Sequence, residues 1–356
     1  MTKFFDKLTS LGFALVFLFA FLWVITVLPP ETVYEERRPS YAEPTFTLAS
    51  FLDSSYVSRL EAYLGDATPC RSLLYRLHTA VFSGVLQNPE CHGARKTAYG
   101  LEKAMPAFDE ALISHNLSVV SAYRARLLNA QNAYSVLIPD KSVYTAGDTD
   151  YARALSLLSS ADGFSLVECR DTLTVDSYFY GDIHIRPECY GDFARRLSEA
   201  MGFRPTEGLT VTDGIRARGT LALQYPSEIY DEFCRLEESC GVLAGLTVTA
   251  QDGAARLLYA EGALDDPYDL YLGGEAANGV LTLKNPNARA EKRLIVFRDS
   301  FARAFAPYLV GDYREIVLVD LRAPKQVIAS TLDGYADVEC DVLLMVSTHT
   351  LFSSRF

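Results

Sequence analysis

The sequence predicts an α/β fold with a mainly parallel sheet. From residue 133 onward, short apolar segments alternate with helical patterns, apart from one interruption at 205–290. The runs 317–319 and 343–346 are continuously apolar, as is typical of strands that are covered on both faces. With 356 residues, 49% of them hydrophobic, the chain is long enough to bury a sizeable core.

The N-terminus predicts a membrane anchor. Lys3 and Lys7 precede an apolar, uncharged run at 11–28, which is near the lower length limit for a helix that spans ~30 Å of hydrocarbon. Residues 1–28 would thus comprise a short cytoplasmic tip and a transmembrane anchor, because the lysines before the apolar run place the N-terminus inside. The protein would cross the cell membrane once, with everything after residue 28 outside the cytoplasm. A cleaved signal peptide is the alternative, but its apolar core is usually shorter and ends in small residues.

The next segments are helical or irregular. Residues 29–45 are rich in proline and charge and predict an extended linker. A helical pattern covers 46–82, residues 83–105 look irregular, and 112–130 predicts an amphipathic helix. We assign 46–204 and 291–356 to the α/β domain, with its first part a helical region.

The α/β pattern then runs to the end of the chain, with one insertion. The predicted strands are 133–139, 164–168, 293–297, 315–320 and 341–346, and the predicted helices are 150–160, 188–201, 301–309 and 326–335. Residues 205–290 predict a β-rich insertion. Its short runs are 209–212, 220–224, 245–249 and 255–259, and 229–240 is either helical or part of this β-rich region.

Composition narrows the function classes. The net charge of -12 and the lack of a basic stripe in the sequence argue against a nucleic-acid partner. The seven cysteines form no Cys-x-x-Cys pair. Local disulfides (Cys70 with Cys91, or Cys234 with Cys240) and buried free thiols are both open.

Ser300 is the candidate nucleophile. It follows the predicted strand 293–297 and precedes the predicted helix 301–309. This turn places a serine at the carboxyl end of a strand and at a helix N-terminus, where ligands and anions are favoured. Serine and aspartate are also favoured N-caps, so a purely structural Asp299-Ser300 cap is the alternative.

His184 is the candidate base. Asp182 precedes it by two positions, and in an extended segment both side chains project to the same side. A structural, hydrogen-bonded histidine is the alternative. His349 follows the last strand and faces either the same crevice or solvent. The other histidines, at 78, 92 and 115, have no partner in sequence. No metal-ligand spacing and no phosphate-binding glycine loop occurs, so neither a metal nor a cofactor is expected.

The second part of the chain resembles the bacterial DHHW protein family and the AlgX/AlgJ-like members of the SGNH hydrolase superfamily. The resemblance covers about residues 95–356, and the family-like blocks are 134–141, 181–188, 268–274, 294–301 and 313–322. The pattern departs from the family where Ile183 and Ile185 replace the usual His and Trp, and where Arg298 replaces the usual Lys.

The resemblance implies a three-layer α/β/α sandwich of SGNH type with a Ser-His-Asp site. Ser300 would be the nucleophile, His184 the base and Asp182 its orienting group. Arg298 and Arg322 would contact substrate, or else form salt bridges, and Gly273 and Gly274 would supply an oxyanion donor, or else a turn.

The function that follows is a membrane-anchored, extracytoplasmic acyltransferase or esterase that acts on O-acetyl groups of a cell-surface polysaccharide. Transfer would require a membrane partner that passes the acyl group outward. The contrasting hypothesis is a non-catalytic envelope scaffold or glycan-binding protein with a degenerate site.

Overall fold

The computed structural model describes residues 2–26, 28–146, 149–262, 264–274 and 279–356, and the chain divides into two compact units, Met1–Cys91 and His92–Phe356. This division differs from the predicted one, because residues 46–91 group with the N-terminal segments rather than with the α/β domain.

The first unit is mainly helical. Its helices are α1 (Thr2–Thr26), α2 (Leu48–Leu52), α3 (Ser55–Asp66) and α4 (Arg71–Thr79), which continues into a π-helical turn at Ala80–Val85. Three two-residue strands accompany them, β1 (Thr32–Val33), β2 (Arg38–Pro39) and β3 (Glu90–Cys91). Strands β1 and β2 pair antiparallel, so the predicted linker contains a short hairpin.

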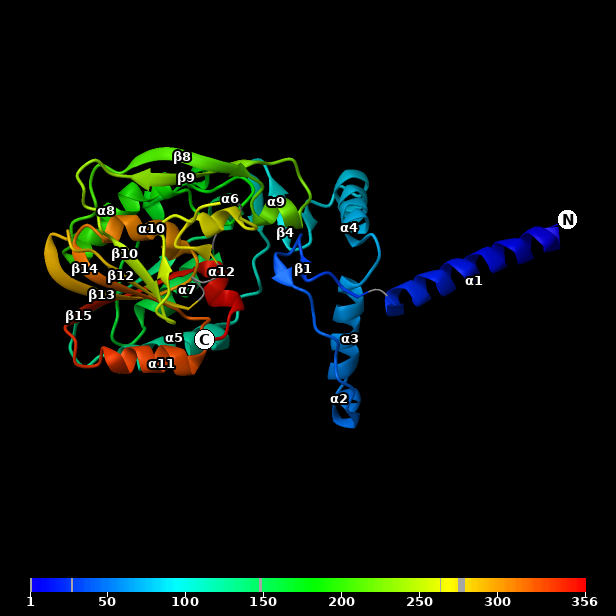
Figure 1. The fold of residues 1–356 in the computed structure, drawn as a ribbon, viewed down its shortest axis with the longest axis horizontal. Helices are drawn as coiled ribbons and strands as arrows, with labels where there is room; N and C mark the ends of the chain where they lie inside the picture. Colours follow the sequence, from blue (N-terminus) through cyan, green and yellow to red (C-terminus); the bar gives the residue numbers. More distant parts are fainter. Residues whose placement is uncertain (1, 27, 147–148, 263, 275–278) are drawn as a thin grey trace. The chain divides into compact units, whose positions relative to one another are not determined.

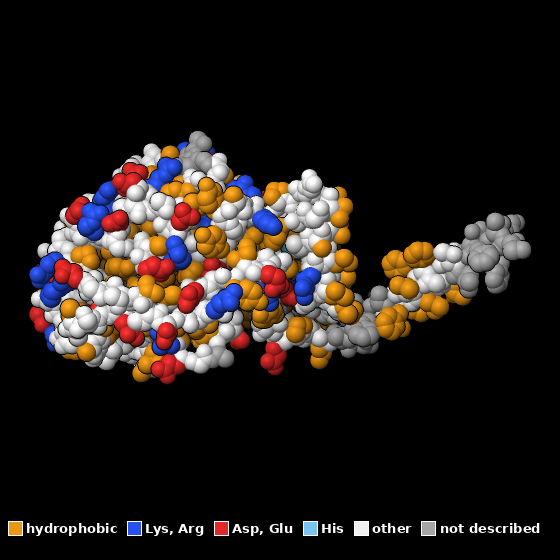
Figure 2. Space-filling view, turned by 90° about the horizontal axis from the view of Figure 1, so that it is seen from above, with side chains coloured by type: hydrophobic (Ala, Val, Ile, Leu, Met, Phe, Trp, Pro, Cys, Tyr) orange, Lys and Arg blue, Asp and Glu red, His pale blue; other side chains and the backbone are white. Residues whose placement is uncertain are grey.

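One buried carboxylate holds the non-helical part of this unit. Arg38 donates to both oxygens of Asp66 at 2.8 Å, and the Tyr41 N–H adds a third bond at 3.0 Å. The exposed apolar side chains of α1 include Phe13, at 63% exposure, and Phe17, at 71%. Figure 2 colours hydrophobic side chains orange, and many of them lie along this helix. Among the residues described, no helix meets both the length and the apolarity needed for a membrane span, so the anchor stays a prediction.

The second unit is built on an eight-stranded sheet with the order β11-β10-β12-β14-β13-β15-β6-β7. The five strands from β14 to β7 are parallel, and β12, β10 and β11 are joined antiparallel at one side. Their bounds are β6 (Ala130–Ile138), β7 (Ser165–Leu166), β10 (Thr247–Ala250), β11 (Ala255–Arg256), β12 (Val280–Lys284), β13 (Ala290–Arg298), β14 (Tyr313–Asp320) and β15 (Cys340–Ser347).

Helices cover both faces of this sheet (Figure 1). On β13, Leu294 and Val296 pack into one core with α8 and α10, whereas Ile295 and Phe297 pack into the other with α5, α7, α11 and α12. The bounds are α5 (Glu110–Arg124), α6 (Ser142–Thr145), α7 (Thr149–Ser159), α8 (Gly191–Met201), α9 (Thr220–Gln224), α10 (Phe301–Leu309), α11 (Lys325–Gly334) and α12 (Thr348–Ser353). The predicted α/β fold with a mainly parallel, doubly covered sheet is confirmed.

In the described part of the second unit, two smaller hairpins lie outside the main sheet. Strands β4 (Ala94–Thr97) and β5 (Gly100–Lys103) pair antiparallel, so the segment predicted as irregular is partly ordered. Strands β8 (Thr210–Ala217) and β9 (Asp231–Glu237) form the second hairpin.

Three predictions for 205–290 need correction. The helical alternative for 229–240 is wrong, because β9 occupies it and pairs with β8. The predicted strand at 220–224 is the helix α9, whose Leu221, Ala222 and Leu223 are all buried. Strands β10, β11 and β12 extend the main sheet, because β12 pairs along its whole length with β14. The β-rich segment is therefore only in part separate from the sheet.

Of the two alternatives for the cysteines, the free thiols describe the structure. All seven cysteines are free thiols, and Cys91, Cys169, Cys234 and Cys340 are buried. Burial raises the pKa of the Cys169 thiol to about 12 and that of the Cys340 thiol to about 11, so both stay protonated and pack as small apolar groups.

Candidate active site

Ser300 lies where β13 ends and α10 begins, at the carboxyl edge of the parallel strands. Its hydroxyl makes no capping bond to the helix. Asp299 takes that role instead: one carboxylate oxygen accepts from the Phe301 N–H at 3.0 Å, and the other accepts from the Ser347 N–H at 2.8 Å. The Ser300 Oγ is therefore left available for another partner.

That partner is His184. Its Nε2 lies 2.8 Å from the Ser300 Oγ, and its Nδ1 lies 2.6 Å from the Asp182 Oδ1. The three predicted residues therefore meet in the order carboxylate, imidazole, hydroxyl. Such an arrangement lets an imidazole accept a hydroxyl proton while the carboxylate holds the ring in one tautomer.

Asp182 is kept ionised by its hydrogen bonds. Burial alone would raise its pKa, because the side chain is fully enclosed. The charge and ring N–H of His184, together with the backbone N–H groups of Thr220 (2.8 Å) and His184 (3.1 Å), outweigh that effect and hold the pKa below its usual range. A buried carboxylate that accepts from several N–H donors is favoured in the charged form.

Helix α9 supplies one of these donors through a close backbone approach. Thr220 begins the helix, and its N–H points at the Asp182 Oδ2. Gly219 precedes it, and a Cβ there would lie 2.5 Å from both the Asp182 Cβ and the Gly181 carbonyl oxygen. Only glycine fits this approach without movement of the loop.

Two further charged residues hold the loop that carries Asp182. On β9, the Asp231 carboxylate accepts from the Tyr180 and Gly181 N–H groups, both at 2.7 Å. Lys141 donates to the carbonyls of Phe179 at 2.7 Å, Leu101 at 3.0 Å and Tyr99 at 3.1 Å. Burial raises the pKa of Asp231 and lowers that of Lys141 to about 8, in each case because the charged form is desolvated.

Tyr268 contacts both His184 and the Ser300 turn. Its ring stacks on the imidazole with centroids 3.5 Å apart and planes 7° apart, and its hydroxyl donates to the Ser300 carbonyl at 3.1 Å. Burial raises the pKa of this hydroxyl far above its usual value, so it remains a donor. Tyr268 lies in a 3₁₀ turn (Pro267–Leu270). The Asp266 carboxylate caps this turn, because its Oδ1 accepts from the Tyr268 N–H at 2.9 Å.

The two arginines predicted as substrate contacts both form ion pairs with Asp320. Arg298 is fully buried, and its guanidinium lies 3.0 Å from Asp320, which also binds Arg322 at 2.7 Å. Burial lowers the pKa of Arg298 to about 10. The salt-bridge alternative therefore describes both residues, and the buried Arg298 cannot reach a substrate.

Gly273 and Gly274 form a left-handed turn, with φ of 79° and 75°. A Cβ on Gly273 would meet Arg256 at 3.3 Å, and one on Gly274 would meet Asp269 at 3.0 Å. These contacts fit the turn interpretation and place neither glycine next to Ser300.

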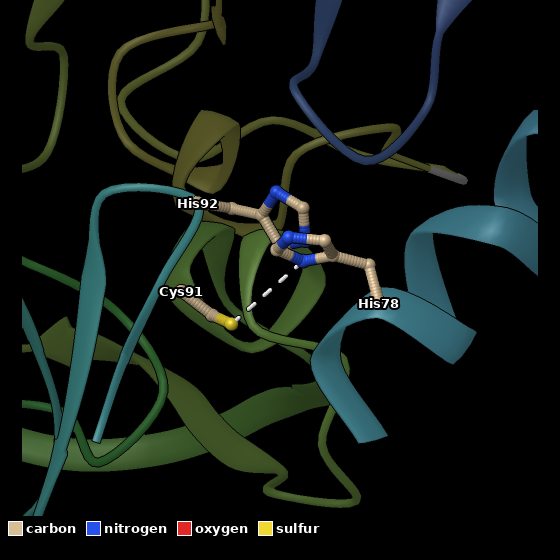
Figure 3. A group of neighbouring side chains, drawn as sticks. All are labelled: His78, Cys91 and His92. Atoms are coloured by element: carbon tan, nitrogen blue, oxygen red, sulfur yellow. Dashed lines mark hydrogen bonds between the residues drawn. The ribbon is translucent and has the colours of Figure 1, made fainter. Parts of the chain in front are cut away.

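His349 and His78 have other partners. The His349 N–H donates to Asp140 at 2.6 Å, and burial lowers the pKa of the His349 ring to about 4 and raises that of the Asp140 carboxyl to about 7. In the first unit, His78 stacks on Phe82 (centroids 4.1 Å apart), and its Nδ1 lies 3.9 Å from the Cys91 thiol (Figure 3). The expected absence of a metal stays a prediction.

Sequence reasoning gave no role to Thr220, Asp231, Lys141 or Tyr268. Lys141 and Tyr268 lie in two of the family-like blocks, which was a signal for them. Thr220 donates to Asp182, and Asp231 accepts from the Tyr180 N–H; both partners lie more than 35 residues away in sequence. No local sequence pattern indicates such interactions.

Comparison with solved structures shows the same architecture. A DHHW family protein from Eubacterium siraeum superposes with a TM-score of 0.59 at 15% identity, over 74% of this chain and 94% of that one. The chain has the fold of that DHHW protein. The predicted resemblance is thus confirmed at the level of the fold.

Bacillus cereus PatB1 also superposes on the chain. The TM-score is 0.54 at 15% identity, over 74% of this chain and 98% of that one. For the structure of PatB1 with a sulfonyl adduct, the TM-score is 0.56 at 16% identity, over 74% of this chain and 97% of that one. No family model and no curated protein sequence matches the chain.

Proposed function

We propose that the chain is a serine-dependent acyl-transfer enzyme that acts on O-acetyl groups of a cell-surface polysaccharide. The observation that carries the proposal is the 2.8 Å contact between His184 Nε2 and Ser300 Oγ, with Asp182 on the other ring nitrogen. A hydroxyl, an imidazole and an ionised carboxylate in this order form the arrangement of a nucleophilic serine.

The first half-reaction forms an acyl-serine. The Ser300 Oγ attacks the carbonyl carbon of an acetyl ester while its proton passes to His184 Nε2. The tetrahedral intermediate then expels the alcohol, which takes that proton from His184. Asp182 stabilises the imidazolium between these two proton transfers.

The second half-reaction releases the acetyl group. His184 accepts a proton from a sugar hydroxyl or from water, and the resulting oxygen nucleophile attacks the acyl-serine. The Ser300 Oγ leaves and recovers the proton from His184. A sugar hydroxyl gives transfer, and water gives hydrolysis.

The start of α10 suits the oxyanion. The backbone N–H groups of a helix N-terminus stabilise negative charge. The Phe301 N–H already binds Asp299, which leaves the Ser300 N–H as the donor that we assign to the oxyanion.

The cellular setting is part of the proposal. The apolar run at 11–28 would anchor the chain in the cell membrane, with the C-terminal part outside the cytoplasm. A membrane partner protein would then deliver the acetyl group. The sequence resemblance to the AlgX/AlgJ-like proteins supports transfer over hydrolysis.

The test is acetylation of the full chain by p-nitrophenyl acetate, followed by intact mass. We expect one added acetyl group and release of nitrophenol. Ser300→Ala should lower the turnover by at least about 10³-fold, whereas Ser159→Ala, an exposed serine on α7, should match the wild type.

The acceptor is tested in the same reaction. Oligosaccharides with free hydroxyls are added, and acetylated sugar is measured against free acetate. Equal adduct formation and equal nitrophenol release by Ser300→Ala and wild type, or neither an adduct nor release above the uncatalysed rate in either, would overturn the enzyme and favour a scaffold role.

A further inference from the structure

The Tyr268 ring is stacked flat on the imidazole of His184. The ring centroids are 3.5 Å apart and the planes differ by 7°. Tyr268 is 1% exposed and His184 is 6% exposed, so little water reaches the contact. Phe301 also touches His184, but its ring is tilted by 53° with centroids 4.8 Å apart. Of these two described rings, Tyr268 is the one that presents its full π face to the imidazole.

Such a face discriminates between the two protonation states of His184. An aromatic ring has negative potential over its face, and it attracts a cation that lies within about 6 Å of its centroid. A neutral imidazole gains little from this attraction, whereas an imidazolium gains more when it is desolvated. The contact is therefore stronger in the state that forms while Ser300 loses its proton.

The Tyr268 hydroxyl acts on the other reacting residue. It donates to the Ser300 carbonyl at 3.1 Å, so one side chain touches the base and the backbone of the nucleophile. Its own position is fixed by Arg303 on α10, which donates to the carbonyls of Tyr268 (3.2 Å) and Tyr271 (3.1 Å) and pairs with Asp269 at 2.9 Å.

We propose that Tyr268 is a positioning residue that stabilises the imidazolium of His184 through its ring and fixes the Ser300 turn through its hydroxyl. This inference rests on the proposed acyl transfer for its catalytic meaning. The claim that the Tyr268 ring stabilises the imidazolium of His184 does not depend on the proposed acyl transfer.

Other charges near His184 have to be held constant. Asp182 binds the ring directly, and Asp231 and Lys141 act on Asp182 from β9 and from the end of β6. On the α10 side, Asp299 lies in the Ser300 turn, and the Arg303 guanidinium is 5.2 Å from the Tyr268 ring centroid and paired with Asp269. None of these residues is changed in the test.

The experiment is an NMR titration of the His184 ring in the full chain, assigned with His184→Gln. Tyr268→Leu should lower the pKa of His184 by about 0.4 to 0.7 unit or more, because a lost cation–π contact of about 0.5–1 kcal/mol or more converts at about 1.36 kcal/mol per pKa unit. Tyr268→Phe keeps the ring face and should leave the pKa within about 0.2 unit. Phe301→Leu is the matched control and should shift it less than Tyr268→Leu.

A rise in the pKa of His184 in Tyr268→Leu would overturn the inference. If Tyr268 only excludes water, Tyr268→Leu admits water to the cation and raises the pKa of His184. An unchanged pKa would also contradict the proposal. If Tyr268→Leu fails to fold, a ring-fluorinated phenylalanine at 268 is compared with Tyr268→Phe, because fluorine weakens the negative face and leaves the shape nearly unchanged.

The acetylation rate separates the two proposals. The pH at which half-maximal adduct formation occurs should fall in Tyr268→Leu together with the NMR value, and Tyr268→Phe should slow adduct formation without moving that pH. If Tyr268→Leu lowers the pKa of His184 as expected but the wild-type chain forms no acetyl adduct, the inference about the Tyr268 ring stands and the proposed enzymatic function is rejected.

Discussion

Asp299 and Ser300 divide two tasks at the start of α10. A serine at a helix start normally binds the helix N–H groups itself. Here Asp299 binds the Phe301 and Ser347 N–H groups, and the Ser300 Oγ faces His184. Asp299 thus carries the capping bonds, and the Ser300 Oγ is left to contact His184.

Asp182 should contribute a pH-dependent part of the stability. Its pKa lies below the ordinary value of 3.8, so the native state binds fewer protons than the unfolded chain. The contribution is complete above that value and is lost as the pH falls below it. We expect Asp182→Asn to lower the free energy of unfolding by about 2–3 kcal/mol at pH 7.

This difference should shrink below pH 3.8. Urea unfolding of both chains between pH 3 and pH 7 measures it. A deficit that stayed constant over the whole range would show that the carboxylate charge has no part in it.

Asp320 should be far more sensitive to truncation than a surface carboxylate. It pairs with the fully buried Arg298 at 3.0 Å. Asp320→Ala leaves that guanidinium without its carboxylate, at a cost of about 3–5 kcal/mol. Asp333→Ala breaks an exposed pair with Arg126 and should cost less than about 1 kcal/mol.

Chemical denaturation of the two variants gives this comparison. Similar losses for both would mean that the Arg298 guanidinium finds another partner or reaches solvent when Asp320 is removed.

The candidates Asp182, His184 and Ser300 came from local spacing together with the surrounding α/β pattern and the order of the family-like blocks, because each local signal alone also fits a structural role. Asp182 and His184 are two positions apart, and Ser300 stands between a strand pattern and a helix pattern. The supporting groups were not accessible in this way. The Thr220 N–H is a backbone donor, and Asp231 binds backbone N–H groups of residues 180 and 181. Neither interaction leaves a mark in side-chain spacing.

At the scale of elements, α9 connects the β8–β9 hairpin to the site. The helix starts at Thr220, directly after the Gly219 contact with the Asp182 loop. Asp231, which begins β9, holds the same loop from the other end of this segment. The hairpin region therefore shapes the site although it contributes no member of the triad.

Gly219→Ala should disturb this connection. The added Cβ would lie 2.5 Å from Asp182, so the loop has to shift, at a cost of about 1–3 kcal/mol. We expect acetyl-adduct formation to slow by at least about 10-fold, because small displacements of reacting groups are costly. Stopped-flow release of nitrophenol measures the rate.

Gly191→Ala is the matched control. Gly191 begins α8 with no atom within 4 Å of the added Cβ, so stability and rate should stay near wild type. Equal rates for the two variants would mean that the Gly219 contact has no influence on the triad.

Elements were predictable where burial imposes a pattern. The parallel strands β13, β14 and β15 have continuous apolar segments at 294–297, 316–319 and 342–346, because both faces of the sheet are covered there. Helix α9 was mistaken for a strand because five residues are too few to show a helical period. The membership of β10–β12 in the main sheet was missed because strand pairing depends on residues distant in sequence, such as Val280 and Val319.

At the scale of the molecule, both hydrophobic cores belong to the second unit. Every buried residue of the two clusters lies between Ile113 and Phe356. A region with its own two-sided core can fold alone. We therefore expect residues 92–356 to unfold cooperatively and, if the proposed chemistry is right, to form the acetyl adduct.

Circular dichroism during thermal unfolding, with intact mass after acetylation, tests the fragment. A non-cooperative transition would show that residues 1–91 are needed to complete the fold. A cooperative transition without the adduct would separate folding from activity.

The two outer strands of the main sheet, β7 and β11, have only two residues each. A long open edge exposes a row of unpaired N–H and C=O groups that another chain can pair with, and very short edge strands remove most of that template. The buried, strongly apolar strands β13 and β15 lie several positions inside. The order of strands thus shields the most aggregation-prone segments of the chain from contact with a neighbouring copy.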